Sequence, residues 1–216
     1  MNDALVLAVG VAISPLPIAV LTMILSGTNP RTLGSSFALG WLAGVTGSTV
    51  VLVALVGAAD TSDETPLWIS VPELLVGLCF LALAAHFWRG RHRVRPAGPP
   101  RWLAALDSLT PTRSAGLGLV LAAANPKNLG LALAAAIAIA EANASSAATA
   151  AAATLFVAIG TAGVAVPLAL SAAAPGRSRV ALASFRGWLL RYDAVVLTLL
   201  GLAVGAKLVY DGFSAL

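Results

Sequence analysis

A single lysine, Lys127, lies in the middle of a long apolar stretch of the chain. It belongs to the tetrapeptide Asn-Pro-Lys-Asn at 125–128, and residues 115–121 before it and 129–140 after it are almost all apolar. A charged side chain at the centre of a membrane costs roughly 2.5–3.5 kcal/mol on insertion scales. Pro126 also interrupts the helical hydrogen bonds, and hydrocarbon cannot satisfy the carbonyl groups that it frees. Together these residues predict a polar site between helices, of the kind found in solute transporters.

The residues at 125–128 offer more than one kind of chemistry. A protonated Lys127 would attract a carboxylate, phosphate or sulfate group, whereas a neutral amine there could exchange a proton. Asn125 and Asn128 supply amide donors and acceptors that could orient a head group. The alternative without function is a lysine whose ammonium snorkels to the membrane surface. We predict that Asn125, Pro126, Lys127 and Asn128 bind substrate, and the sequence leaves the role of the lysine open.

A second break is predicted in the first apolar segment, which reads Ser14-Pro15-Leu16-Pro17. The two prolines remove two backbone donors, which exposes carbonyl groups near residues 11 to 13, and the Ser14 hydroxyl can hydrogen-bond across the gap. A packing kink would explain the same pattern. The functional interpretation is that this break meets the one at 125–128 in the middle of the membrane. Ser14, Pro15 and Pro17 therefore join the predicted substrate-binding site.

Acidic partners inside the membrane are few. Glu73 follows Pro72 near one end of an apolar segment, and Asp193 lies close to Arg191 near the end of another. An ion pair with Arg191 is the simpler interpretation of Asp193. Both carboxylates are nevertheless candidate sites for proton coupling.

We predict no metal site, no cofactor and no enzyme. His86 lies beside Trp88 near a segment end, where histidine is more often an interface residue than a ligand. The lone Cys79 offers neither a disulfide nor a cysteine pair, and we expect it to pack as a small hydrophobic side chain. The sequence contains no recognisable Ser/His/Asp or Cys/His set.

The elements that must position these residues are membrane helices. Of the 216 residues, 59% are hydrophobic and only 10% are charged, whereas soluble domains carry about 25% charged residues. About 20 apolar residues in a helix span the hydrocarbon layer of a membrane. Six segments meet this requirement, at residues 4–26, 34–58, 67–88, 113–140, 147–173 and 187–211. The sequence therefore predicts an all-α integral membrane protein.

The charged residues are divided between the two sides of this topology. The net charge is +4, and the arginines gather in three loops that share one side, whereas most carboxylates lie on the other. Basic loops remain in the cytoplasm, so we predict an inner (plasma) membrane protein with both termini extracytoplasmic. Arginines placed in this way do not indicate nucleic acid as a partner.

The basic loop at 89–112 divides the chain into halves, residues 1–88 and 113–216. Its arginines are expected to bind anionic lipid head groups, and residues 102–109 have the spacing of a short interfacial helix. Each half holds three helices, an odd number, so the second half would be inverted relative to the first. The first helix of each half carries a proline break, a pattern that points to the central site of a transporter. Two inverted three-helix repeats with broken first and fourth helices are predicted.

Small residues are predicted to set the distances between helices. Gly40, Gly44 and Gly47 form a close-packing pattern in the second segment, and packing surfaces of this kind are compatible with a homodimer. The five tryptophans mostly lie near segment ends, as interface anchors do.

Several of these motifs resemble one known family. Ser14-Pro15-Leu16-Pro17, the stretch Phe-Ala-Leu-Gly-Trp-Leu-Ala-Gly at 37–44, and residues 102–129 are similar to the GAP family of the lysine-exporter (LysE) superfamily. The family is linked to addressing peptidoglycolipids and sulfolipids to the actinobacterial cell envelope. The resemblance implies an inner-membrane exporter with six helices in two repeats. Thiol-redox relatives in the superfamily need a membrane cysteine pair, which this chain lacks, and Lys127 would repel the cations that other relatives export.

The function predicted from these features is secondary export of an anionic or zwitterionic amphiphile, such as a lipid. No nucleotide-binding motif is visible, so energy would come from a gradient or from a partner. The alternatives are an exporter of a small soluble solute, such as an amino acid, and a non-transporting membrane adaptor of a lipid-export complex.

Overall fold

The computed structural model describes residues 2–27, 29–59, 67–90, 109–140, 142 and 145–173, and isolated positions between 184 and 213. Every element in this part of the chain is an α-helix, which confirms the all-α class. The helices are α1 (Asn2–Ala12), α2 (Pro15–Ile24), α3 (Pro30–Ala59), α4 (Leu67–Gly90), α5 (Pro111–Ala123), α6 (Pro126–Ala140) and α7 (Ser146–Ala173).

Two helices, α3 and α7, are long and apolar enough to cross a membrane by themselves. Two further pairs qualify if each bent pair is one span: α1 with α2, bent by 41°, and α5 with α6, bent by 56°. By length and composition, the described residues therefore contain two candidate membrane spans, or up to four. The first and fourth predicted segments are each broken in two, with a proline at the first position of the second helix because it has no N–H to lose there. The predicted interfacial helix at 102–109 lies outside the described residues except for Leu109.

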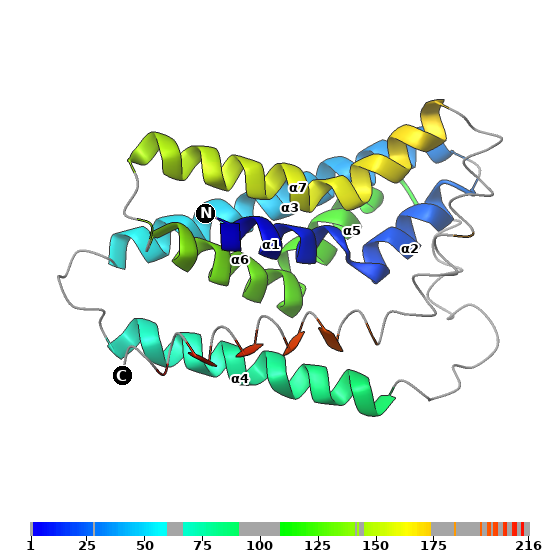
Figure 1. The fold of residues 1–216 in the computed structure, drawn as a ribbon. Helices are drawn as coiled ribbons and strands as arrows, with labels where there is room; N and C mark the ends of the chain where they lie inside the picture. The colour runs from blue at the N-terminus through cyan, green and yellow to red at the C-terminus, as the bar shows by residue number, and fades with distance from the viewer. Residues whose placement is uncertain are drawn as a thin grey trace.

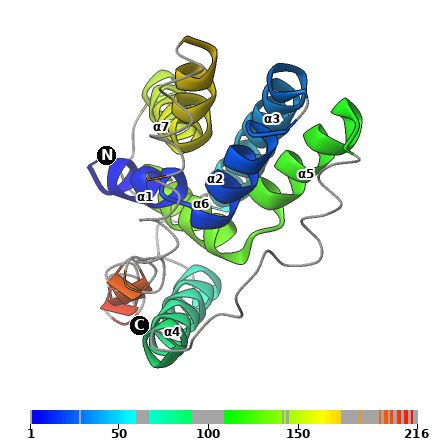
Figure 2. The same ribbon diagram turned by 90° about the vertical axis from the view of Figure 1, so that its right-hand side faces the viewer.

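The helices form a main bundle with α4 beside it. Within the bundle α3 packs most extensively on α5, and α1 packs on α6 and α7. Figures 1 and 2 both show α4 below this bundle, next to the described positions of the last segment. Those positions between 195 and 213 are helical, and Gly201 and Gly205 face the backbone of α4.

Glycines allow α3 and α5 to approach closely. A Cβ on Gly118 of α5 would clash with the Phe37 carbonyl, and a Cβ on Gly40 of α3 would clash with the Ala115 carbonyl. Gly44 likewise faces α5, so the predicted close packing at Gly40 and Gly44 is correct. Gly47, by contrast, faces open space, and the prediction for it is wrong because α5 ends at Ala123, which is already at the level of Gly44.

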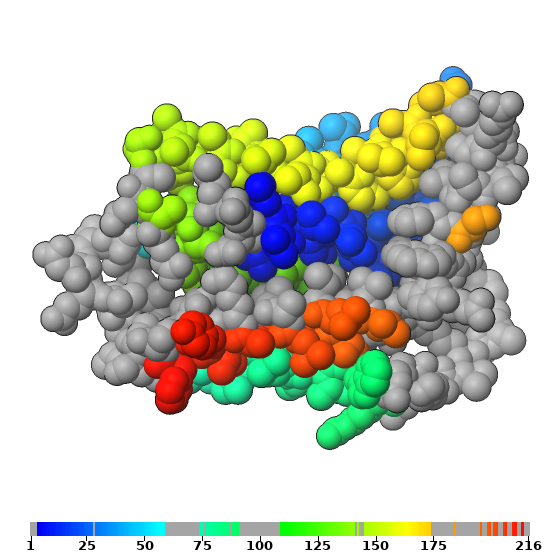
Figure 3. All heavy atoms as spheres, viewed as in Figure 1, coloured from blue at the N-terminus to red at the C-terminus, as the bar shows by residue number. Residues whose placement is uncertain are grey.

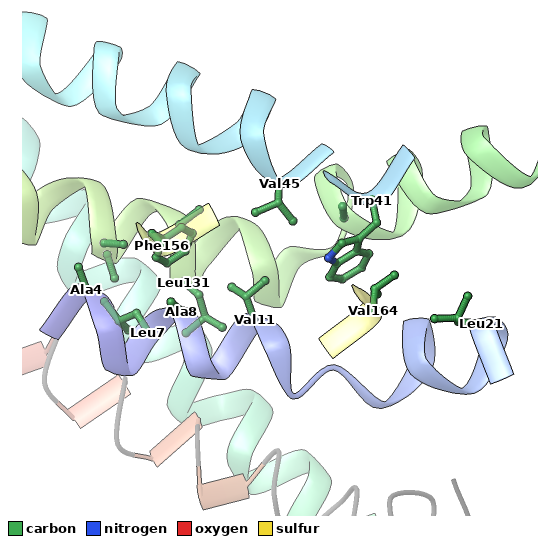
Figure 4. Close-up of a cluster of buried hydrophobic side chains, with 14 of the residues drawn as sticks. Ala4, Leu7, Ala8, Val11, Leu21, Trp41, Val45, Leu131, Phe156 and Val164 are labelled. Carbon is green, nitrogen blue, oxygen red and sulfur yellow. The ribbon is translucent and has the colours of Figure 1, made fainter. Parts of the chain in front are cut away.

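Apolar side chains from all seven described helices contribute to the core, and Figure 4 shows the part of it around Val11, Trp41, Leu131 and Phe156. Trp41 is almost completely buried, and its Nε1 donates a hydrogen bond to the Gly160 carbonyl at 3.4 Å. Trp41 is therefore a core residue rather than an interface anchor.

The outer surface of the bundle is also apolar, as expected where lipid replaces water. Leucine and valine side chains are exposed along α3, α4 and α7, and α7 covers the upper part of the face in Figure 3. Cys79 is exposed on α4. The sequence predicts that this thiol packs as a small hydrophobic side chain, and it does not pack between the described helices. Lipid tails are as apolar as a leucine side chain, so a small hydrophobic residue is stable facing them.

The described arginines lie at one end of the bundle. Arg31 is in the first turn of α3, Arg89 in the last turn of α4 and Arg113 in the first turn of α5, and all three are exposed. Figure 1 shows these helix ends on its right-hand side. The fold thus separates these cations from the C-terminal ends of α3 and α6.

Candidate functional site

The first break, between α1 and α2, falls at Ile13 and Ser14. Ser14 has an extended backbone (φ −105°, ψ 106°), which ends α1, and Pro15 starts α2. Since Pro15 and Pro17 have no N–H, the Val11 and Ile13 carbonyls lose the donors that a continuous helix would provide.

Lys127, from α6, bonds to two of the carbonyl groups at the end of α1. Its Nζ donates to the Gly10 carbonyl at 2.7 Å and to the Ile13 carbonyl at 3.3 Å. The lysine is partly buried. Its ammonium therefore holds the broken end of a helix that is 117 positions away in the chain at Gly10.

The other two carbonyl groups of the break meet different partners. The Ser14 hydroxyl lies 2.8 Å from the Val11 carbonyl oxygen and donates to it. The Ala12 carbonyl faces Gly163 of α7, where any Cβ would clash with it. The carbonyl groups expected to be exposed near residues 11 to 13 are thus each approached by a side chain or a close backbone.

The second break, between α5 and α6, also places a proline at the start of its second helix, but here the preceding side chain caps the helix, which Ser14 does not do for α2. Pro126 is the first residue of α6, and Asn125 caps the helix, since its Oδ1 accepts a hydrogen bond from the Lys127 N–H at 3.0 Å. A small polar residue followed by proline therefore starts the second helix of both pairs.

Asn128 joins the two breaks. Its side chain is buried, and Nδ2 donates to the Leu121 and Ala122 carbonyls at the end of α5, at 3.3 and 3.4 Å. Its Oδ1 lies 3.3 Å from Ser14 Oγ and accepts from that hydroxyl, which it shares with Val11. All the polar groups of this amide are used within the protein, so Asn128 positions the site.

The electrostatics of Lys127 depend on the neighbouring helix. At the N-terminus of α6 a cation is opposed by the helix dipole by roughly 0.3–1 kcal/mol. Hydrogen bonds from a charged donor contribute about 1.5–3 kcal/mol each, and the C-terminal end of α1 carries the favourable sign. The stabilisation from the two hydrogen bonds to α1 therefore exceeds the unfavourable dipole interaction at the N-terminus of α6. An ammonium has three N–H groups, which leaves one that no described acceptor takes.

The predicted site residues are brought together in part. The Ser14 side chain bonds directly to Asn128, and Lys127 bonds to the carbonyl of Ile13, the residue before Ser14. Asn125 and Pro126 start α6. Pro15 and Pro17 are buried at the start of α2. Glu73 lies in α4, but its side chain is outside the described part of the structure. Asp193 is also outside the described residues.

Two glycines of the site were not identified from sequence. Gly10 contributes a carbonyl oxygen, a group that every residue has, so no sequence signal marks it. Gly163 lies three residues after Gly160 in α7, and both approach α1. Residues three apart lie on the same face of a helix, and small residues on one face of a membrane helix are a packing signal that could have identified the contact. Among the described residues, no group of three His, Cys, Asp or Glu side chains could hold a metal ion.

The comparison with known families is decisive for the class of protein. Residues 4–214 match the family described as Sap, sulfolipid-1-addressing protein. The chain belongs to this family. The match confirms the resemblance to the sulfolipid-addressing (GAP) family, and it extends over both broken helix pairs. It identifies the chain as a membrane protein whose family is associated with lipid addressing.

No curated protein and no solved structure matches the chain.

Proposed function

We propose that this protein is an inner-membrane secondary exporter that moves an anionic or zwitterionic amphiphile outward, with its head group held where the two broken helices meet. The family is named after a sulfolipid, and a sulfated head group is an anion. The observation that carries the proposal is the position of Lys127 Nζ, which bonds to two carbonyl oxygens at the broken end of α1. When this amine is protonated, its third N–H and its charge are available to an anion.

The surroundings of Lys127 fit an anionic head group. The α2 and α6 helices both begin at the breaks, and helix N-termini favour anions through their free N–H groups and their dipoles. Broken helices at corresponding places are where transporters bind substrate. In this proposal Lys127 contacts the head group, Asn125 and Pro126 shape the start of α6, and Ser14, Pro15, Pro17 and Asn128 hold the breaks in register.

The remaining parts of the proposal concern the whole chain. Residues 1–88 and 113–216 act as inverted repeats that alternate access to the site, and the loop at 89–112 gathers lipid with its arginines. Glu73 and Asp193 are the candidates for coupling transport to protons. A homodimer is compatible with this arrangement.

The test measures lipids and small metabolites on each side of the membrane in cells that lack the protein. Cells are restored with wild type, Lys127→Met or the control Arg113→Gln, which removes an exposed cation at the end of the bundle. Lys127→Met removes one charge-assisted hydrogen bond to the head group. We therefore expect its transport rate to fall about 10- to 100-fold. Arg113→Gln should export as the wild type does.

Each alternative gives a different result. If Lys127→Met exports as well as the wild type, the lysine is not part of the substrate-binding site. A soluble metabolite that accumulates in place of a lipid would indicate the small-solute exporter. If no species is redistributed and the protein purifies with a stoichiometric partner, the adaptor is favoured.

A further inference from the structure

The end of α1 has the features of a cation-binding site. The Gly10 and Ile13 carbonyl oxygens converge on one point, the Lys127 Nζ, at 2.7 and 3.3 Å. Neither oxygen has its usual helical donor, since Pro17 has no N–H and Ser14 leaves the helix with an extended backbone. Two oxygens in a water-poor setting need hydrogen-bond donors, and at the negative end of a helix dipole a positively charged donor is favoured.

We propose that the Gly10 and Ile13 carbonyls form a monovalent-cation site and that the Lys127 ammonium occupies it as a tethered ion. Unwound carbonyl groups and the C-terminal ends of half-helices coordinate free monovalent ions in other transporters. Here the ion belongs to the chain, so the break should need no free sodium or potassium. The inference goes beyond the proposed function because it concerns what holds the broken helix, whichever molecule is carried.

The second break provides an internal comparison. The end of α5 has the same problem of free carbonyl groups at Leu121 and Ala122, and there a neutral amide, Asn128, satisfies them. Lys127 and Asn128 are adjacent in α6, so one helical turn serves both breaks. Lys127 bonds to the oxygens of α1 and Asn128 to those of α5. Only the α1 site should therefore bind a free cation when the lysine ammonium is removed by substitution.

The experiment replaces the tethered ion with a free one. Lys127→Ala removes three carbons and the ammonium, which together correspond to n-propylammonium, whereas Lys127→Met fills the space and leaves no room. Thermal unfolding of the purified full chain in detergent is followed with about 10–100 mM propylammonium, since a bound ligand stabilises by mass action. Tetramethylammonium, which has the same charge but no N–H, is the matched control.

We expect Lys127→Ala to unfold about 5 °C below the wild type in tetramethylammonium and to recover at least half of this loss in propylammonium. Lys127→Met should remain low in both solutions, and the wild type should not respond to either. If Lys127→Met unfolds within about 1 °C of the wild type, the oxygens need no cation and the proposal is overturned. Equal unfolding temperatures for Lys127→Ala in the two solutions would also overturn it.

A second measurement applies if Lys127→Ala does not fold in ordinary buffer. Membranes that contain this variant are then extracted in propylammonium or in tetramethylammonium, and monodisperse protein is measured by size exclusion. Recovery in propylammonium alone supports the cation site. No recovery in either solution overturns it. Because neither measurement uses transport, failure here leaves the export proposal standing, and failure of export leaves the cation site standing.

Discussion

At the scale of single residues, the first turn of α6 explains how two broken helices can meet inside a membrane. Unpaired carbonyl groups are costly in hydrocarbon, and each break creates several of them. Lys127 bonds to the end of α1, and its neighbour Asn128 bonds to the end of α5 and to Ser14. The helix turn that begins with Pro126 thus supplies donors to the free carbonyl groups of both breaks. It also fixes the distance between the two breaks.

The first prediction at this scale concerns Asn128. Asn128→Ala removes the donors to two buried carbonyl groups and the acceptor of Ser14, and each unsatisfied buried group costs about 1–3 kcal/mol. We expect the unfolding temperature in detergent to fall by about 5 °C or more.

Leu129→Ala is the matched control for Asn128→Ala. Leu129 is the next residue of α6, and its side chain is 38% exposed. Its truncation should change the unfolding temperature much less. Equal effects of the two substitutions would show that the amide contributes packing only.

At the scale of elements, the glycines determine where helices touch. Gly118 of α5 lies against the backbone of α3, whereas Gly116 of the same helix faces open space. Both residues lie inside the helix, so replacing either one with Ala changes the helix propensity by the same amount. Only their contacts with α3 differ. The pair therefore separates packing from helix propensity.

We predict opposite effects for the two alanine substitutions. Gly118→Ala should destabilise the protein by about 1–3 kcal/mol, because the new Cβ forces α3 and α5 apart. Gly116→Ala should be neutral or stabilising by up to about 1 kcal/mol. Denaturant or thermal unfolding in detergent measures both. A neutral Gly118→Ala would contradict the close contact.

At the scale of the whole molecule, the fold has two ends that differ in charge. The exposed arginines of α3, α4 and α5 lie at one end, and the last turn of α6 lies at the other (Figure 1). If the arginine end is cytoplasmic, as basic loops generally are, residues near Ala142 face outward.

Cysteine labelling tests this orientation. In a Cys79→Ser background, Ala142→Cys should react with a membrane-impermeant maleimide in intact cells, whereas Thr112→Cys should react only after permeabilisation. Both positions are exposed in the structure, so the difference reports the side of the membrane. The reverse pattern would invert the predicted topology, and labelling of both in intact cells would contradict the separation of the two ends.

Much of the fold followed from local rules in the sequence. Proline has no N–H, so Pro15, Pro17 and Pro126 mark the two breaks whatever surrounds them. Runs of apolar residues long enough to cross a membrane place α3 and α7 within a few residues of their predicted bounds. The position of Lys127 beside a break was likewise readable from spacing.

Only the tertiary structure decided which groups meet. The sequence by itself could not show that Lys127 reaches the Gly10 carbonyl, that Asn128 is consumed by both breaks, or that Trp41 is in the core while Cys79 is exposed. Local rules say that a carbonyl group lacks a donor, but every residue carries a carbonyl group. Which donor reaches it depends on how closely the helices approach, and close approaches such as that of Gly163 in α7 to the Ala12 carbonyl join residues far apart in the chain.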